Sequence, residues 1–139
     1  METKIISVSN QKGGTGKTTT SINVGACLAS LGQKTLLIDL DPQANLTTGL
    51  GIDVHENEPT VYDLLKGLAT VKIARKSEIK NLYVIPSGIE LAAAEAELMG
   101  EIGREQQLRT ALSRVEGYDY IIIDTAPTLG VLMLNALSA

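Results

Sequence analysis

A glycine-rich segment at residues 12–19, KGGTGKTT, lies between two runs of apolar residues and leaves few folds open to the chain. Residues 5–8 before it are short and apolar, which predicts a buried strand. Residues 24–31 after it carry apolar side chains at helical spacing, and a second strand is predicted at 35–39. Strand, loop, helix and strand form a βαβ unit with parallel strands and a right-handed connection.

The rest of the chain repeats this alternation. Further strands are predicted at 82–85 and 120–124, and helices at 60–66, 90–99 and 104–116, the first of them opened by a capping box of Thr60 and Asp63. This order predicts an α/β fold with a doubly wound, mostly parallel sheet. A last helix begins at Gly130 and the sequence stops within it. We therefore expect residues 1–139 to be the N-terminal part of one domain, truncated after the fourth strand and the start of this helix.

Composition narrows the class of protein. Hydrophobic residues make up 44% of the chain without any Trp or Phe, which predicts an aliphatic core. The single cysteine, Cys27, shares the predicted apolar helix face with Val24, Leu28 and Leu31, so we expect it in the core of a cytoplasmic protein. The net charge of −4 provides no basic footprint for nucleic acid. A sparse basic run is interpreted as a solvated face: Lys72, Arg75, Lys76 and Lys80.

The glycine-rich segment has the parts of a phosphate-binding loop. Glycines let backbone N–H groups curl around phosphate oxygens, a lysine meets the β- and γ-phosphates, and a hydroxyl binds Mg²⁺. A helix N-terminus directly after the loop attracts anions as well. The standard pattern has glycine where this chain has Gln11, and the alternative is a glycine-rich turn without a ligand. The predicted nucleotide-binding residues are Gly13, Gly14, Thr15, Gly16, Lys17, Thr18 and Thr19.

Carboxylates follow two of the predicted strands. Asp39 and Asp41 come at the end of the second strand and Asp124 at the end of the fourth. The carboxyl ends of parallel strands face the ligand crevice, and carboxylates gathered there favour a bound Mg²⁺. We predict Thr18, Asp39 and Asp124 as the metal site and Asp41 as the residue that orients an attacking water. The alternative for these aspartates is the capping of loops, a common role of Asp.

The loop resembles the deviant Walker A motif of the ParA/MinD superfamily of ATPases. The segments DPQAN at 41–45 and DTAP at 124–127 resemble its ParA/Soj branch, although Ala126 stands where that branch more often has proline. The resemblance implies that Lys17 contacts the bound ATP of its own subunit and that Lys12 reaches the phosphates of a dimer partner. It also implies the strand order third, second, fourth, first, with later strands continuing beyond the first.

The function implied by this resemblance is an ATP-hydrolysing dimerisation switch for chromosome or plasmid partition. ATP and Mg²⁺ would be its cofactors. Its partners would be a second copy of the chain, a ParB-type centromere-binding protein, and non-specific DNA bound through a C-terminal part absent here, which places it on the nucleoid. One alternative is a MinD-like membrane-associated positioning ATPase, and another is a kinase or synthetase. The nitrogenase iron protein, which needs cluster cysteines, is disfavoured.

Overall fold

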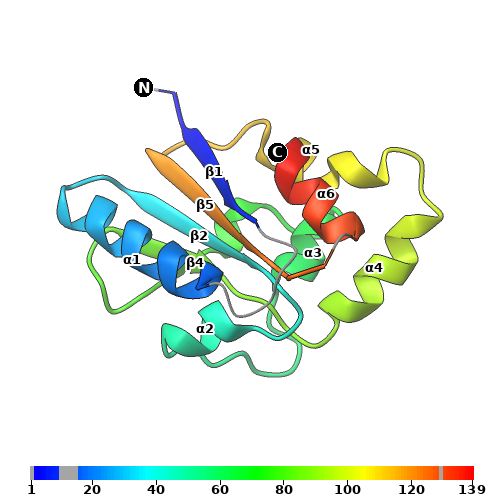
Figure 1. Cartoon of the computed structure of the whole chain (residues 1–139), viewed down its shortest axis with the longest axis horizontal. Helices are drawn as coiled ribbons and strands as arrows, with labels where there is room; N and C mark the ends of the chain where they lie inside the picture. Colours follow the sequence, from blue (N-terminus) through cyan, green and yellow to red (C-terminus); the bar gives the residue numbers. More distant parts are fainter. Residues whose placement is uncertain (1, 10–15, 129) are drawn as a thin grey trace.

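The computed structural model describes residues 2–9, 16–128 and 130–139, and in this part of the chain a five-stranded sheet forms the centre (Figure 1). Its strand order is β1-β5-β2-β4-β3. The bounds are β1 (Lys4–Val8), β2 (Thr35–Leu40), β3 (Arg75–Lys76), β4 (Leu82–Ile85) and β5 (Tyr120–Thr125). The order of the four predicted strands is thereby confirmed, and these four pair in parallel. The two-residue β3, too short for a sequence pattern, adds an antiparallel edge.

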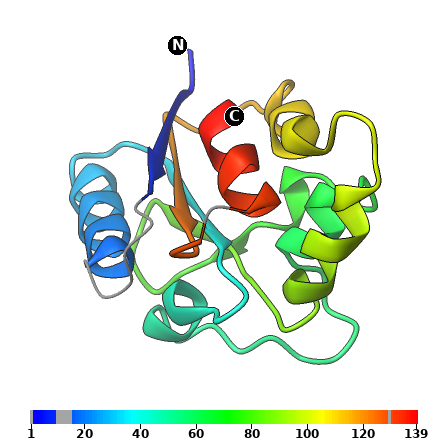
Figure 2. The same cartoon turned by 45° about the vertical axis from the view of Figure 1, so that its right-hand side comes forward.

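Helices cover both faces of the sheet, as a doubly wound fold requires (Figure 2). On one face lie α1 (Lys17–Ser30) and α2 (Asn45–Gly49). On the other lie α3 (Val61–Leu65), α4 (Leu91–Met99), α5 (Gln107–Leu112) and α6 (Val131–Ser138). Short 3₁₀ turns occupy Val71–Ile73 and Arg104–Gln106. The helix predicted at 104–116 is therefore shorter than expected, and α2 was not predicted.

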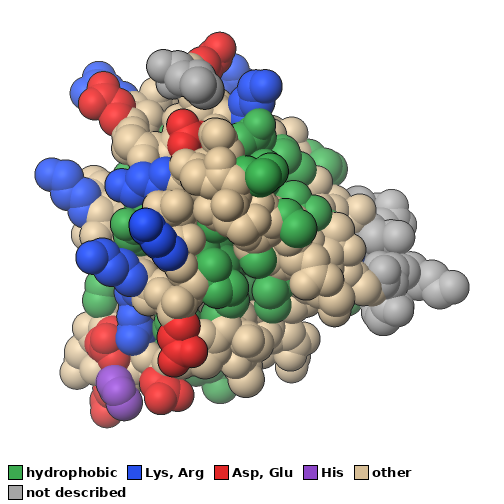
Figure 3. Space-filling model, turned by 90° about the vertical axis from the view of Figure 1, so that its left-hand side faces the viewer, with side chains coloured by type: hydrophobic (Ala, Val, Ile, Leu, Met, Phe, Trp, Pro, Cys, Tyr) green, Lys and Arg blue, Asp and Glu red, His purple; other side chains and the backbone are tan. Residues whose placement is uncertain are grey.

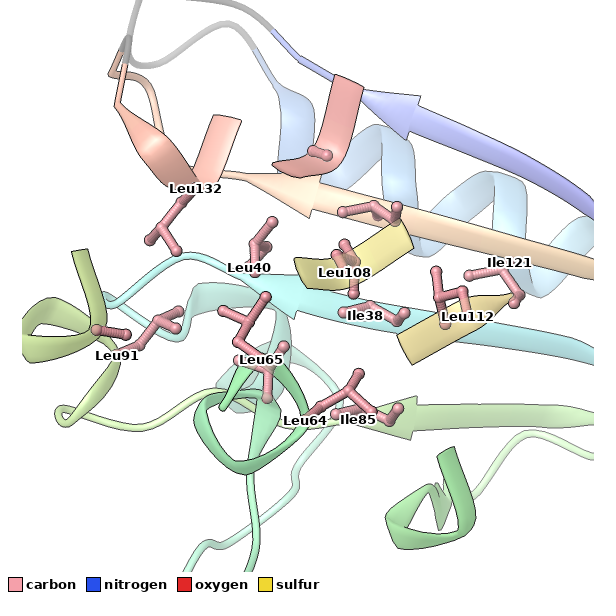
Figure 4. Packing of buried hydrophobic residues seen from close by; sticks show 14 of the residues in the cluster. Ile38, Leu40, Leu64, Leu65, Ile85, Leu91, Leu108, Leu112, Ile121 and Leu132 are labelled. Carbon is pink, nitrogen blue, oxygen red and sulfur yellow. The ribbon is translucent and has the colours of Figure 1, made fainter. Parts of the chain in front are cut away.

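The strand β2 is central, and its residues divide the core between the two faces. All six residues of β2 are buried. Leu36, Ile38 and Leu40 belong to the cluster under α3 to α6, of which Figure 4 shows Ile38 and Leu40. Leu37 belongs to the cluster under α1. Because side chains alternate across a strand, a strand covered on both faces is mostly apolar, as in a parallel sheet, and in β2 Thr35 and Asp39 are the buried polar exceptions. The aliphatic core predicted from composition is confirmed.

The predicted capping box at the start of α3 is confirmed. The Thr60 backbone N–H donates to Asp63 Oδ2 at 2.8 Å, and Asp63 is the third residue of the helix. The Thr60 hydroxyl also accepts from the N–H of Tyr62 and donates to Glu90 Oε1. This start fixes where α3 leaves the loop that follows α2.

The buried face predicted for α1 is wrong except at Leu28, which is partly buried against the core. Val24 is 39% exposed, Leu31 is 75% exposed and Cys27 is exposed, so Cys27 is not a core residue. The buried residues are small ones at i, i+4 and i+8: Ser21, Gly25 and Ala29. They let the helix lie close to the sheet, since a Cβ on Gly25 would be 2.8 Å from Leu37 Cδ2. Figure 3 views this side of the molecule, where hydrophobic side chains reach the surface beside a group of lysines and arginines.

Candidate functional site

The start of α1 forms one wall of the candidate site. The predicted residues Lys12, Gly13, Gly14 and Thr15 lie outside the described residues. The description resumes at Gly16, whose φ of 83° is in the left-handed region that favours glycine. No described side chain caps α1, and its first turn contains no acid. The backbone N–H groups at this helix end are therefore oriented to meet an anion such as a phosphate.

Two predicted metal ligands meet at this helix end. Thr18 Oγ1 donates a hydrogen bond of 2.8 Å to Asp124 Oδ2, from α1 to the end of β5. Asp124 is fully buried. The other carboxylate oxygen, Oδ1, lies 3.1 Å from the hydroxyl of Ser21, a residue that the sequence reasoning did not select. The only signal for Ser21 is its spacing of three from Thr18, which places the two hydroxyls on the same side of the helix.

Asp39 lies beside Asp124 on the neighbouring strand and anchors the following loop. The two residues are register partners in the β2–β5 pair. Asp39 Oδ2 accepts hydrogen bonds from the backbone N–H and the hydroxyl of Thr47, at 2.9 and 2.6 Å. Oδ1 accepts from the N–H of Asp41 at 3.3 Å. The predicted metal ligand Asp39 therefore has both oxygens occupied by the 41–47 segment.

The carboxylate of Asp41 folds back over its own loop. Asp41 Oδ1 accepts from the N–H of Gln43 at 2.9 Å, and Ala44 adopts a left-handed φ of 56°. The loop is also tied to the end of β4, because Ser87 Oγ donates to Asp41 O at 2.7 Å and Ser87 N–H donates to Thr47 Oγ1 at 3.0 Å. Thr47 and Ser87 were missed because serine and threonine are common in loops and only tertiary contacts distinguish these two.

The site concentrates negative charge. Burial raises the pKa of Asp39 from 3.8 to about 6, and hydrogen bonds from Thr47 only partly oppose this. The pKa of Asp124 is also raised by burial, against the lowering effect of the Thr18 and Ser21 hydrogen bonds. Each carboxylate is thus disfavoured in its charged form, which a nearby cation would reverse.

The donor set fits Mg²⁺ bound together with a nucleotide. Among the described residues, no group of three or more His, Cys, Asp or Glu is arranged to hold a metal. One hydroxyl and one or two carboxylates suit Mg²⁺, which commonly keeps waters and takes substrate phosphates as further ligands. At the end of β1, the buried Ser9 Oγ has no hydrogen-bond partner within the described part of the chain. A buried hydroxyl of this kind fits a site completed by a ligand.

The remaining predicted features lie away from this site. Lys72, Lys76 and Lys80 are exposed, as predicted for a solvated face. Arg75 donates to the backbone oxygen of Asp53 at 2.7 Å. In the part of the chain that the structure describes, no helix has the length and apolar character to cross a membrane.

Curated relatives match the chain along nearly its whole length. The sporulation initiation inhibitor protein Soj of Bacillus subtilis is 54% identical over 138 residues, which are 98% of this chain and 54% of that protein. The chromosome-partitioning ATPase Soj of Treponema pallidum is 49% identical over 132 residues, 94% of this chain and 51% of that protein. The chain therefore spans about half the length of these relatives.

Solved structures share the fold. Cobyrinic acid a,c-diamide synthase from Mycobacterium smegmatis, crystallised with ADP and magnesium, matches with a TM-score of 0.93 and 41% identity over 99% of this chain and 57% of that one. A variant of McdA from Cyanothece, in complex with ATP, matches with a TM-score of 0.92 and 31% identity over 99% of this chain and 54% of that one. A family model described as AAA domain matches residues 3–139. The chain belongs to this AAA domain family, and within it resembles the Soj and ParA partitioning ATPases.

Proposed function

We propose that this chain is the N-terminal part of a P-loop ATPase domain that binds MgATP and hydrolyses it as a dimerisation switch in chromosome or plasmid partition. The observation that carries the proposal is the meeting of Thr18 and Asp124 at the N-terminus of α1, 2.8 Å apart. The names of the partitioning relatives and the nucleotide complexes of the structural neighbours support it.

The chain's own residues divide the work of binding. The loop at residues 12–19 and the first N–H groups of α1 hold the phosphates, and Lys17 contacts the β- and γ-phosphates. Thr18 and Asp124, which are joined by a hydrogen bond, would hold the magnesium, and Asp39, the register partner of Asp124, would be a further carboxylate near it. When bound, the ion neutralises charge on the transferred phosphoryl group.

Asp41 orients the water that attacks the γ-phosphate. Its Oδ1 accepts the Gln43 N–H at 2.9 Å, which fixes the carboxylate. Its backbone oxygen is held by Ser87, so that the residue stays at the end of β2. Positioning of this kind is a large part of catalysis in phosphoryl transfer, where the protein does little covalent chemistry.

The switch requires a second copy of the chain. Lys12, which lies outside the described residues, would contact the phosphates of the partner subunit, and arginine fingers supplied by a partner protein are worth about 10³–10⁵ in rate in other P-loop enzymes. A ParB-type protein and non-specific DNA are the proposed partners of the complete ATPase, which acts in the cytoplasm on the nucleoid. These assignments rest on the resemblance to the Soj and ParA relatives.

Replacement of the loop lysine tests nucleotide binding. Lys17→Ala in the full-length protein should abolish MgATP binding measured by calorimetry, because the side chain meets the β- and γ-phosphates. Lys76→Ala, which removes an exposed lysine of β3, is the matched control and should bind as the wild type does. An unchanged ATP affinity in Lys17→Ala would refute the proposed site.

A second candidate function is metabolite synthesis driven by the same loop. It is favoured by the 41% identity to the mycobacterial a,c-diamide synthase. A partitioning ATPase and a synthetase can be distinguished by the compound that accelerates phosphate release. A partitioning ATPase turns over with water as acceptor and responds to DNA and a protein partner, whereas a synthetase needs a small-molecule acceptor. The MinD-like alternative predicts binding to lipid vesicles instead.

A further inference from the structure

We propose that Ser21 is a positioning residue for the magnesium site, acting by holding the carboxylate of Asp124. This inference rests on the proposed function and extends it to a residue that belongs to no recognised sequence motif. Ser21 is fully buried, although a serine side chain is usually exposed. Its hydroxyl lies 3.1 Å from Asp124 Oδ1, in the first half of α1 and one turn beyond Thr18.

Two hydroxyls of α1 contact Asp124, one at each of its carboxylate oxygens. Thr18 donates to Oδ2 at 2.8 Å, and Ser21 lies at Oδ1. A threonine that gives its proton to a carboxylate keeps its lone pairs for a cation. Thr18 and Asp124 would hold the ion, and Ser21 would keep the carboxylate from turning about its Cβ–Cγ bond.

The carboxylates around Asp124 favour such a hydrogen bond to its side chain. Asp39 is its register partner on β2, and carboxylates on neighbouring strands repel each other. A hydrogen-bond donor at Oδ1 offsets this repulsion and favours the charged carboxylate. Asp39 accepts a hydrogen bond from the Thr47 hydroxyl in the same way. Asp124 is thus fixed by a hydroxyl of α1, and Asp39 by a hydroxyl of α2.

A purely structural role for Ser21 is the competing explanation. Its hydroxyl also lies 3.0 Å from Lys17 O, the backbone bond that a serine inside a helix often makes. A hydroxyl has one proton, so it donates to Lys17 O or to Asp124 at any moment. If only the bond to Lys17 O matters, removal of the hydroxyl changes stability but leaves the magnesium dependence of nucleotide binding as it is.

The test separates magnesium affinity from nucleotide affinity in the full-length protein. ATP affinity of Ser21→Ala is measured by calorimetry in EDTA and at rising Mg²⁺ concentrations, with thermal unfolding as the check on folding. We expect an apparent Mg²⁺ affinity about tenfold lower than in the wild type, which is typical for loss of a group that orients a metal ligand, and an unchanged affinity for ATP in EDTA. Ser21→Cys, which is similar in size but is a weak donor, should show the same loss of Mg²⁺ affinity as Ser21→Ala.

Thr20→Ala is the matched control. Thr20 is an exposed hydroxyl residue on the same turn of α1, and its replacement should leave both affinities unchanged. Equal losses with and without Mg²⁺ in Ser21→Ala, or no loss at all, would overturn the positioning role while the wild type still binds MgATP. A wild type that fails to bind MgATP would instead overturn the proposed function, and the positioning role with it.

Discussion

At the scale of single residues, Asp39 and Asp41 have different surroundings although only one residue separates them. Asp39 accepts three hydrogen bonds from the loop that it anchors, and it is fully buried. Asp41 accepts one bond from the N–H of Gln43 through Oδ1. We therefore expect a substitution at Asp39 to act on folding and a substitution at Asp41 to act on catalysis.

Asp41→Ala should keep ATP binding and dimer formation but lose hydrolysis, because positioning the water is separable from holding the nucleotide. A loss of about 10²-fold or more in phosphate release is the expected size. Dimer formation is followed by the scattering mass with ATP. Asp53→Ala removes an exposed aspartate and serves as the control. Normal turnover in Asp41→Ala would remove Asp41 from the catalytic role.

Asp39 predicts a pH dependence of stability in the ligand-free protein. Burial raises its folded pKa from 3.8 to about 6, so the folded state binds this proton more tightly than the unfolded chain does. The stabilisation is fully present below pH 3.8 and is lost as the pH rises through about 6. The free energy of unfolding should therefore fall by about 1–2 kcal/mol between pH 4.5 and 7.5 through this group.

Urea unfolding of the wild type and of Asp39→Asn in EDTA isolates this effect. The asparagine keeps an acceptor for Thr47 but does not titrate. The free energy of unfolding of the wild type should therefore fall relative to that of Asp39→Asn as the pH rises from 4.5 to 7.5. A difference that is constant across this pH range would show that Asp39 does not carry a raised pKa.

At the scale of elements, α1 shows which packing rule prevails when two compete. Its apolar residues at helical spacing predicted the buried face, yet the structure buries Ser21, Gly25 and Ala29 instead. A helix that lies close to a parallel sheet needs small residues at the contact. The spacing of apolar residues does not predict where those small residues are. Spacing alone therefore located the helix but not its face.

Two substitutions in α1 distinguish these faces. Gly25→Ala should destabilise the protein by about 1–3 kcal/mol, because its Cβ would lie 2.8 Å from Leu37 Cδ2 in a filled core. Val24→Ala, at the neighbouring exposed position, should change stability by less than about 0.5 kcal/mol. If the face predicted from spacing were right, Gly25→Ala would stabilise by about 1 kcal/mol through helix propensity. Urea unfolding of both variants decides between these outcomes.

The elements that the sequence predicts well are those with long, strong patterns. The strands β2 and β5 each contain three consecutive aliphatic residues, and the alternation with helices determines the fold class. The two-residue β3 and the five-residue α2 are held by tertiary contacts and leave no pattern of their own. The same holds for the residues of the site. Thr18, Asp41 and Asp124 belong to sequence motifs and were predicted. Ser21, Thr47 and Ser87 belong to no motif and reach the site only through tertiary contacts.

At the scale of the whole molecule, apolar surface gathers around the β1 edge of the sheet. β1 is an outer strand, paired with β5 on one side. Ile5 and Ile6, on its two faces, are 37% and 39% exposed. Exposed leucines and a valine lie on the helices α1 and α6 or directly after α1: Val24, Leu31, Leu134 and Leu137. An apolar face of this kind commonly marks a surface that another segment or chain covers.

We predict that the 139-residue chain on its own associates with itself through β1. An outer strand presents unpaired N–H and C=O groups and is a template for a second chain. Covering a few hundred Å² of apolar surface at ~25 cal/mol per Å² contributes several kcal/mol, comparable to the net stability of ~5–15 kcal/mol of a domain.

Sedimentation of the 139-residue chain without ATP measures this association. The wild type should sediment as a dimer or larger species at tens of micromolar, and Ile6→Lys should shift it toward the monomer, because a charged residue on an edge strand opposes pairing. Lys76→Ala at the opposite edge of the sheet is the control and should leave the association unchanged, since β3 and β1 are the two ends of the order β1-β5-β2-β4-β3. A stable wild-type monomer at these concentrations would show that the β1 edge needs no cover, and that the exposed isoleucines are tolerated as ordinary surface.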